Sequence, residues 1–280
     1  MLETETIQKI EEFVYLKPRS VDEIAKYIDK NWRTADRYIR EIEENYGTIT
    51  TTVFREGSRG ALKVVYWASV EKASQSKFQQ RLEEEILREK GKHAFSSFEI
   101  YQHVADKNKH AYVEEAASED QTKENIPSLK SFVENTKKQL IMFSGNLSFA
   151  NLKTKEIDLY KIFDDLVKKG VSIKIVCRVD LAGRENVEKM LSLNYKYGKE
   201  LVEIRHRDQP LRALISDNKA IRLKEIKEPT GRTNELNKRL FIFYAINDKS
   251  WAEWLSKIFW NMFSSSIDAS KRLEELKKLM

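Results

Sequence analysis

Apolar residues near the start of the chain recur every three or four positions, which is the spacing that gives a helix one buried face. A first helix is predicted over residues 3–15 by the positions of Ile7, Ile10, Phe13 and Val14. Pro18 ends this helix, because proline cannot donate the next backbone hydrogen bond. Ser20 and Glu23 then form a capping-box pattern, so a second helix is expected from there through Ile28.

A third helix follows a short turn. Asn31 is a good N-cap, and the apolar spacing predicts that the helix runs from about Trp32 to Asn45. Its inward positions are Ala35, Tyr38, Ile39 and Ile42. Gly47 can adopt the left-handed conformation that commonly ends a helix. We therefore expect the helix to expose the side chains that lie between the inward positions.

The spacing of apolar residues then changes to two, which is typical of β-strands. The alternating residues are Ile49, Thr51 and Val53 before a turn at residues 56–60, and Leu62, Val64 and Tyr66 after it. Three helices followed by a hairpin give the element order of a winged helix-turn-helix. We therefore predict that residues 1–70 form such a domain.

The next segment is charged and has no single assignment. Residues 72–92 have helical spacing, with Phe78, Leu82, Ile86 and Leu87 on one side. This helix could be a connector or could pair two copies of the chain. A short helix is expected over residues 95–104, and residues 106–125 show no period and are predicted to be a solvated linker or loop. Residues 71–125 are thus expected to be a helical connector and linker.

From residue 126 to residue 280 expected helices alternate with expected strands. Helices are predicted at 128–138, 155–169, 184–195 and from about 248 onward, and strands at 140–143, 171–179, 201–206, 211–216, 219–224 and 239–246. Such alternation favours an α/β layer fold with a parallel or mixed sheet. The predicted fold class of the whole chain is therefore α+β / α/β.

Composition narrows the function only slightly. The net charge of +6 permits an anionic partner, but the charge must gather on one face to favour one. Cys177 is the only cysteine and the four histidines are scattered, so we predict no disulfide, no metal site and no cofactor. No apolar run reaches the roughly 20 residues that span a bilayer, and the acidic N-terminus is unlike a secretory signal. We expect a cytoplasmic protein without a membrane partner.

Cations gather at the start of the third predicted helix. In a helix-turn-helix the N-terminal end of the second helix of the pair enters the major groove, where arginine hydrogen-bonds guanine or phosphate. The candidate DNA-binding residues on this helix are Trp32, Arg33, Thr34, Arg37 and Arg40. The expected hairpin adds candidates for the flanking phosphates or the minor groove, namely Arg55, Ser58, Arg59 and Lys63. Asp36 is the one acid near the reading end, and a winged helix that binds protein stays the alternative.

Two stretches resemble known families. Residues 20–47 resemble the helix-turn-helix core of archaeal and bacterial winged-helix regulators, with Ser20 as the cap and Thr34 at the start of the reading helix. The run LVEIRHRDQPLRALISDNKAIRLKE, which begins at residue 201, is similar to the core of the phospholipase-D-like family. That family carries His-x-Lys-x4-Asp, and the matching positions here are Pro210, Arg212 and Asp217.

The proline decides what the second resemblance implies. The family's reaction needs an imidazole that attacks phosphorus, and Pro210 has neither a nucleophile nor a proton to donate. The resemblance therefore implies the phospholipase-D-like scaffold without the phosphodiesterase reaction, and we predict no catalytic residue. His206 lies four positions away, so an enzyme with a rearranged site stays an alternative.

The combination resembles archaeal transcription regulators of the TrmB type, which join a winged helix to a degenerate phospholipase-D-like domain. The resemblance covers roughly residues 1–70 and 126–270. It implies a homodimer, because the phospholipase-D-like fold commonly pairs two copies. Candidate dimer elements are the helix at 74–90 and the aromatic-rich helix at 248–264, most of whose aromatic side chains we expect to pack onto the sheet.

Four arginines in this part suggest a further possibility. Arg178, Arg205, Arg207 and Arg212 could line an anion pocket left by the lost active site. A structural ion pair between Arg212 and Asp217 is the favoured interpretation, so a small-molecule effector is left open without support.

The sequence therefore predicts a sequence-specific DNA-binding transcription regulator. Its partners are double-stranded DNA and a second copy of itself, and its phospholipase-D-like domain is non-catalytic and serves dimerisation or an effector. Two alternatives stay open. One is a phosphodiesterase or nuclease with a rearranged site, and the other is a nucleoid-type architectural protein that coats DNA with little sequence preference.

Overall fold

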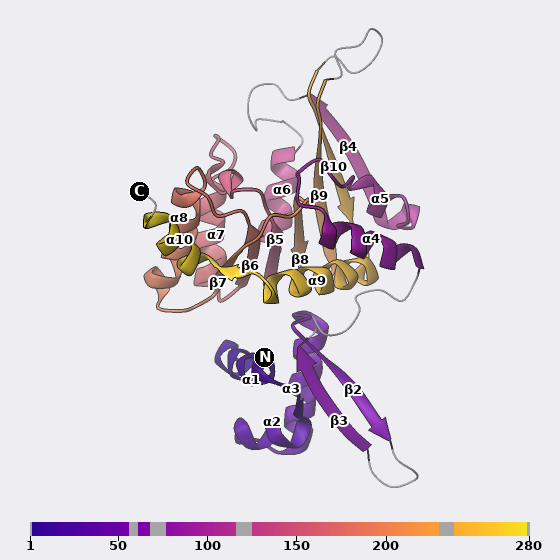
Figure 1. The fold of residues 1–280 in the computed structure, drawn as a ribbon, viewed down its shortest axis with the longest axis vertical. Coiled ribbons are helices and arrows are strands. Elements are labelled where there is room, and N and C mark those ends of the chain that lie inside the picture. The colour runs from indigo at the N-terminus through magenta and orange to yellow at the C-terminus, as the bar shows by residue number, and fades with distance from the viewer. Residues whose placement is uncertain (1, 56–60, 68–76, 116–124, 230–237, 279–280) are drawn as a thin grey trace.

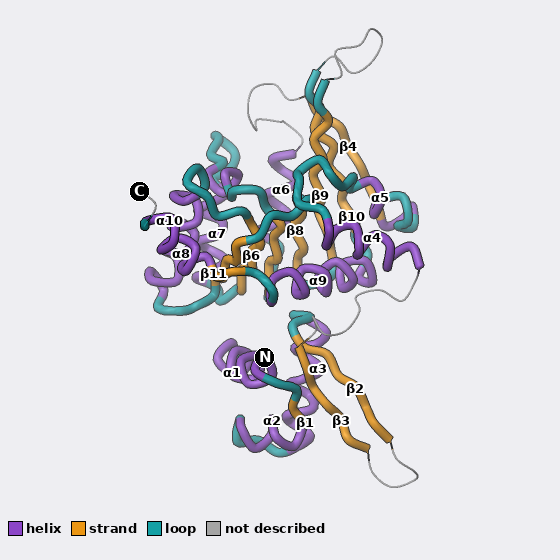
Figure 2. Tube along the Cα trace, in the orientation of Figure 1, coloured by secondary structure: helices purple, strands orange, loops and turns teal. Residues whose placement is uncertain are grey.

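The computed structural model describes residues 2–55, 61–67, 77–115, 125–229 and 238–278. Figure 1 shows a small N-terminal unit of helices and a hairpin beside a larger body built on one sheet. The larger sheet has eight strands among the described residues, and helices lie on both of its faces (Figure 2). The chain is thus a mixture of helices with a large mixed sheet, as the sequence predicts.

The N-terminal unit has the expected three helices and hairpin, together with a short strand, β1, that the sequence did not predict. They are α1 (Thr4–Leu16), β1 (Arg19–Ser20), α2 (Val21–Tyr27), α3 (Trp32–Asn45), β2 (Ile49–Arg55) and β3 (Ala61–Trp67). The strands pair in the order β1-β3-β2. The capping box of Ser20 and Glu23 is present, and Asn31 caps α3. Gly47 has φ +66°, so its left-handed conformation is confirmed.

The register of the hairpin decides which side of β3 faces the helices. Thr51 lies opposite Val65, and the fully buried Val65 belongs to the face that packs on the helices. Val64 and Tyr66 therefore point to the other face, where the Tyr66 hydroxyl hydrogen-bonds the hydroxyl of Thr52 at 2.9 Å. The alternating spacing therefore predicts the strand, but the register of the hairpin decides which set of its residues is buried.

The large sheet has the strand order β11-β7-β6-β5-β8-β9-β10-β4. Strands β5, β6 and β7 are parallel, and the other neighbours pair antiparallel. The strands are β4 (Lys109–Glu115), β5 (Gln139–Phe143), β6 (Ser172–Cys177), β7 (Val202–His206), β8 (Ala213–Ser216), β9 (Ala220–Lys227), β10 (Leu240–Ile246) and β11 (Ile267–Asp268). The mixed sheet agrees with the prediction.

Each face of this sheet has its own apolar core. One core packs Leu140 and Met142 against α6 (Asn125–Glu134), α7 (Leu159–Lys168), α8 (Arg184–Tyr197) and α10 (Ala269–Lys277). The other packs Ile141 and Phe143 against α4 (Lys77–Arg88), α5 (Phe98–Tyr101) and α9 (Lys249–Ser264). Short 3₁₀ turns lie at Asp106–Asn108 and Ser148–Asn151. Because β5 is covered on both faces, its sequence is a continuous apolar run rather than an alternating one.

The predicted linker at 106–125 is wrong at residues 109–115, and residues 116–124 lie outside the described residues. Residues Lys109–Glu115 form β4, which pairs with β10 at the edge of the sheet. The Tyr112 ring stacks on Phe243 with 5.2 Å between ring centroids. The polar residues of β4 hid the strand, because an edge strand has fewer buried positions and a weaker alternating pattern.

The two helices considered for dimerisation, α4 and α9, bury most of their apolar side chains against other parts of the same chain. Leu82 and Ile86 of α4 are fully buried in the core that also contains α9. Trp254, Phe259 and Trp260 of α9 are buried as well, which confirms that most of its aromatic side chains pack onto the sheet. The apolar side of α4 is therefore not a free dimer face, and homodimerisation itself stays a prediction.

Candidate functional site

The N-terminal end of α3 is exposed on one side of the helix. The Asn31 side-chain oxygen accepts a hydrogen bond from the Thr34 amide at 2.9 Å, which fixes the first turn. Trp32 is 47% exposed, and Arg33 and Arg37 are exposed beside it. The side chains that the sequence places at the reading end therefore share one accessible surface.

Asp36 lies just behind this surface and is buried. Its carboxylate forms ion pairs with Lys63 Nζ at 2.7 Å and with Arg40 Nη2 at 2.9 Å. The acid near the reading end is thus neutralised by two cations. Arg33 forms no hydrogen bond or ion pair within the described part of the chain, and the Arg37 guanidinium rests over the Tyr38 ring at 5.1 Å. The exposed charge at this end is positive.

These contacts change what two candidates do. Lys63 was expected to contact phosphates, but its ammonium holds Asp36 and links β3 to α3. Arg40 also holds Asp36 while its side chain stays largely exposed. Arg55 is the last residue of β2, and Ser58 and Arg59 lie outside the described residues.

A second carboxylate that the sequence analysis missed holds α3 against the hairpin. Glu43 accepts hydrogen bonds from the Thr50 hydroxyl at 2.7 Å and from the Thr51 amide at 3.0 Å. Ile39 and Ile42 are fully buried on the same helix. The helix that carries the candidate arginines is therefore fixed by both polar and apolar contacts. The threonine run after an acidic helix end is the sequence signal for this anchor.

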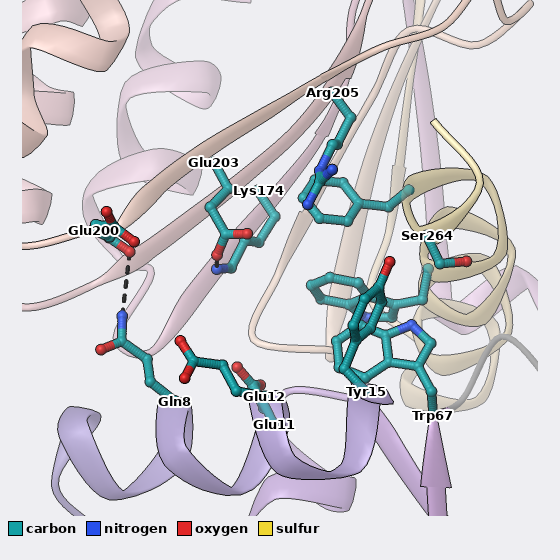
Figure 3. Close-up of a pocket in the computed structure, with 12 residues that line it drawn as sticks. Gln8, Glu11, Glu12, Tyr15, Trp67, Lys174, Glu200, Glu203, Arg205 and Ser264 are labelled. Carbon is teal, nitrogen blue, oxygen red and sulfur yellow. Dashed lines mark hydrogen bonds and ion pairs between the residues drawn. The ribbon is translucent and has the colours of Figure 1, made fainter. Parts of the chain in front are cut away.

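The N-terminal unit meets the large sheet around a cavity of about 240 Å³ (Figure 3). Trp67, at the end of β3, lies edge-on to Trp260 of α9 with 5.7 Å between centroids and to Tyr15 of α1 with 5.0 Å. The Trp260 indole donates a hydrogen bond to the Tyr46 carbonyl at 3.2 Å. The end of α3 is thereby tied to the body of the protein.

Charged side chains lie in the same junction. Lys174 of β6 is only 5% exposed and forms an ion pair with Glu203 of β7. Burial lowers the pKa of Lys174 to about 8. Burial also raises the pKa of Glu11, whose carboxylate accepts a hydrogen bond from the Thr48 hydroxyl at 2.7 Å. The junction therefore contains groups whose ionisation is costly, which makes its packing sensitive to pH.

Asp217 does not pair with Arg212, so the favoured interpretation of these two residues is wrong. The Asp217 carboxylate accepts hydrogen bonds from the amides of Lys137 at 2.8 Å, Lys138 at 2.8 Å and Gln139 at 2.9 Å. It therefore fixes the start of β5. The three amides lie almost 80 residues away in the sequence, so no local pattern could reveal them.

Arg212 instead faces a cavity of about 290 Å³ on the α6 side of the sheet. Its guanidinium lies over Gly145, where an added Cβ atom would be 3.4 Å from Nη2. Arg222 and Lys224 of β9 line the same cavity. Burial lowers the pKa of Arg212, and the neighbouring Arg178 guanidinium lowers it further.

The four arginines that the sequence suggested do not line one pocket. Arg178 forms an ion pair with Asp180 at 2.7 Å, and Arg207 donates to the Ser265 hydroxyl at 2.8 Å. Arg205 lies over the Phe263 ring in the junction of Figure 3. Of these four arginines, only Arg212 lines the basic cavity. The other cations of the cavity, Arg222 and Lys224, come from alternate positions of β9 that the sequence analysis did not select.

His206 has a structural hydrogen bond. Its Nδ1 atom accepts from the Val179 amide at 2.9 Å, and burial lowers the pKa of the ring, with a smaller contribution from Arg272. It does not line the basic cavity. Pro210 is buried in the loop between β7 and β8.

Two further features of the described residues bear on cofactors and membranes. Within the ranges that the structure describes, no group of three or more His, Cys, Asp and Glu side chains could hold a metal ion. No helix in those ranges combines the length and the apolar character that crossing a membrane requires.

Known proteins resemble the chain only distantly. No protein-family model and no curated protein matches it. It is similar to the structure of Nuc from Salmonella typhimurium, a phospholipase D family member, with 14% identity over 57% of this chain and 97% of that one and a TM-score of 0.40. It is also similar to TrmBL2, an archaeal chromatin protein with a novel mode of DNA binding, with 17% identity over 95% of this chain and 94% of that one and a TM-score of 0.38.

A third similar structure is the phosphatidylserine synthase of Haemophilus influenzae Rd KW20. It has 13% identity over 61% of this chain and 42% of that one, with a TM-score of 0.42. Any conclusion about function must therefore come from the side chains of this chain itself.

Proposed function

We propose that the chain is a DNA-binding transcription regulator whose residues 1–70 act as a winged helix-turn-helix. The observation that carries the proposal is the accessible N-terminal end of α3, where Arg33 and Arg37 are exposed and the nearby Asp36 is neutralised by Lys63 and Arg40. An exposed positive helix end of this kind suits the acceptor-rich edges and phosphates of the major groove.

In this proposal the first half of α3 lies in the major groove. Arg33 and Arg37 donate to base edges or phosphates, and Trp32 and Thr34 contact the adjacent backbone. Arg55, Ser58 and Arg59 reach flanking phosphates from the hairpin. Lys63 supports the reading helix from behind, because its ammonium is engaged with Asp36.

We also propose that the larger part of the chain has no phosphodiesterase activity. Pro210 offers no nucleophile at the motif position, and the ring nitrogen Nδ1 of His206 is occupied by the Val179 amide. Turnover of bis-p-nitrophenyl phosphate that His206→Ala abolishes would overturn this part of the proposal.

We further propose that two copies act together on DNA. A single reading helix makes few phosphate contacts, whereas a dimer doubles them and sets the spacing of two half-sites. Fluorescence anisotropy at one fixed salt concentration would compare a selected site with random DNA. A ratio of affinities well above about 10³ supports a sequence-specific regulator. A ratio near one would favour an architectural protein that coats DNA.

A further inference from the structure

The basic cavity on the α6 side of the sheet has an unusual charge balance. Arg212, Arg222 and Lys224 line it, and none of its other described lining residues is acidic. Most of the remaining wall is apolar, including Leu129, Phe143, Phe149, Leu152, Ile226 and Phe243. Three cations and no acid among the described lining residues give this cavity a positive potential, which favours an anion.

The three cations are held in different ways. Arg222 is 5% exposed and donates to the Ser128 hydroxyl at 2.5 Å and to the Tyr112 hydroxyl. Burial lowers its pKa, which Tyr112 and the nearby Glu114 partly offset. The Lys224 ammonium lies 3.8 Å from the centre of the Phe241 ring. These two side chains are positioned before any ligand arrives.

Arg212 differs from both. Its guanidinium forms no hydrogen bond or ion pair with any described residue, although burial disfavours its charge. It lies over Gly145, so the backbone of the loop after β5 leaves room beside it. A planar guanidinium can donate two parallel hydrogen bonds to a carboxylate or a phosphate. Arg212 is therefore the side chain in this cavity that gains most from an anion.

We propose that this cavity binds an amphipathic anion, a small molecule with a carboxylate or phosphate head and an apolar body. The head pairs with Arg212, with Arg222 and Lys224 adding positive potential, and the body packs against Phe143, Phe149 and the adjoining aliphatic side chains. Binding is non-covalent, and no bond is formed or broken.

The two strands that line the cavity, β8 and β9, also extend to the residues that contact the end of α3. Arg212 directly precedes β8, and Lys224 lies in β9. The Lys224 amide donates a hydrogen bond to the Arg212 carbonyl at 2.9 Å, which joins the two residues. The four residues of β8 span roughly 13 Å from there to the turn. Asn218 in that turn is 2% exposed and receives a hydrogen bond from Ser256 at 2.6 Å.

The turn is in contact with the end of α3. A Cβ atom added to Gly47 would lie 2.9 Å from Asn218 Nδ2, so the two residues pack directly together. Lys138, whose amide is bound by Asp217 in the same turn, lies 3.8 Å from Glu41 of α3. The hairpin thus connects the cavity at one end to α3 at the other, and occupancy of the cavity is expected to change the affinity for DNA.

Binding can be tested without DNA, so this part of the inference does not depend on the proposed function. Isothermal titration calorimetry would compare octanoate and octyl phosphate with octanol and inorganic phosphate. We expect one or both amphipathic anions to bind one per chain, and octanol and phosphate to bind at least about tenfold more weakly. The tighter of the two anions identifies the head group. Equal affinity for octanol, or no binding of either anion to folded protein at millimolar concentration, would overturn the proposal.

Variants locate the site. Arg212→Gln and Lys224→Gln should each weaken binding, the first by about tenfold or more, since it removes the paired head-group contact. Arg207→Gln removes an arginine outside the cavity and should leave the affinity within about twofold. Far-ultraviolet circular dichroism would establish that each variant is folded. Unchanged affinity in folded Arg212→Gln would exclude this cavity as the site.

The predicted effect of the bound anion on the affinity for DNA rests on the proposed function. The dissociation constant for DNA should change by at least about threefold when the anion saturates the wild type. In Asn218→Gly, which removes the contact with Gly47 but tolerates the turn conformation, the anion should still bind and the change should be lost. If the anion binds the wild type and the affinity for DNA stays unchanged, the inference that the hairpin links the cavity to α3 is wrong. Absence of any DNA binding would instead show that the proposed function is wrong, and this inference with it.

Discussion

At the N-terminal end of α3, one buried carboxylate decides the charge that the surface presents. Asp36 forms ion pairs with Lys63 and Arg40. These pairs reduce the positive charge that the two cations add to the exposed surface, and they neutralise the carboxylate that would otherwise repel DNA. Arg33 and Arg37 carry the exposed charge. The reading surface therefore depends on a contact between α3 and β3 as well as on the residues of α3.

Arg37→Ala tests this surface. It should weaken binding to the preferred site by roughly 1–3 kcal/mol and relax the preference at one base position if Arg37 contacts a base edge. Fluorescence anisotropy with the site and its single-base variants measures both effects. Arg88→Ala removes an exposed arginine of α4 as a matched control and should change the affinity little. Equal losses for the two variants would contradict the assignment of α3.

The half-buried Glu11 gives the junction a dependence on pH. Its pKa is raised by burial, so the folded chain holds the proton more tightly than the unfolded chain does. Its contribution to stability is therefore full below the ordinary pKa of about 4.5 and is lost as the pH rises through the raised value. In Glu11→Gln this loss should vanish, so the variant should be more stable than the wild type at pH 7. Urea unfolding from pH 4 to pH 8 would show whether the two curves converge at low pH as expected.

Among the elements, the β8–β9 hairpin joins parts of the chain that are distant in sequence. Its turn holds the start of β5 through Asp217 and the end of α3 through Asn218. Both residues have positive φ, and the Lys219 amide donates to the Ser216 carbonyl at 2.9 Å across them, which closes a tight turn. The turn is therefore a structural centre of the body and of its contact with the N-terminal unit.

Asp217→Ala should lower the free energy of unfolding by about 3 kcal/mol. The variant loses the acceptor of three backbone amides and places alanine in the left-handed region. Asp217→Asn keeps one acceptor oxygen and tolerates that region, so it should cost distinctly less. Urea denaturation of the two variants makes the comparison, and equal losses would show that the left-handed conformation matters little and that one amide oxygen does not replace the carboxylate.

On the scale of the whole molecule, the number of chains that bind one DNA site can be found from the dependence of the DNA affinity on salt concentration. Each phosphate contact that is lost lowers the slope of log affinity against log salt concentration by about 0.9. Arg59→Ala should therefore reduce the slope by about 1.8 if two copies bind together and by about 0.9 if one binds alone. It should weaken binding to all sequences alike. An unchanged slope would mean that Arg59 does not contact phosphate, and light scattering of the free protein would give its oligomeric state separately.

Local sequence signals were enough to predict the helices and the hairpin of the N-terminal unit. Capping residues such as Ser20 and Asn31, the helical spacing of apolar residues and Gly47 act over a few positions, so they can be read without knowing the rest of the fold. The continuous apolar run of β5 and the amphipathic α7 were predictable for the same reason, and together they indicate a layered α/β body.

The pairing of distant segments in the folded chain, in contrast, sets which side chains come into contact. Asp36 was visible as an acid, but its neutralisation by Lys63 depends on the register of the hairpin. Asp217 was visible as a motif position, but its carboxylate binds amides almost 80 residues earlier rather than Arg212. The edge strand β4 and the cations of β9 were missed because partner strands give them their roles. Long-range pairing places these groups, and a local pattern carries no information about a partner that lies far along the chain.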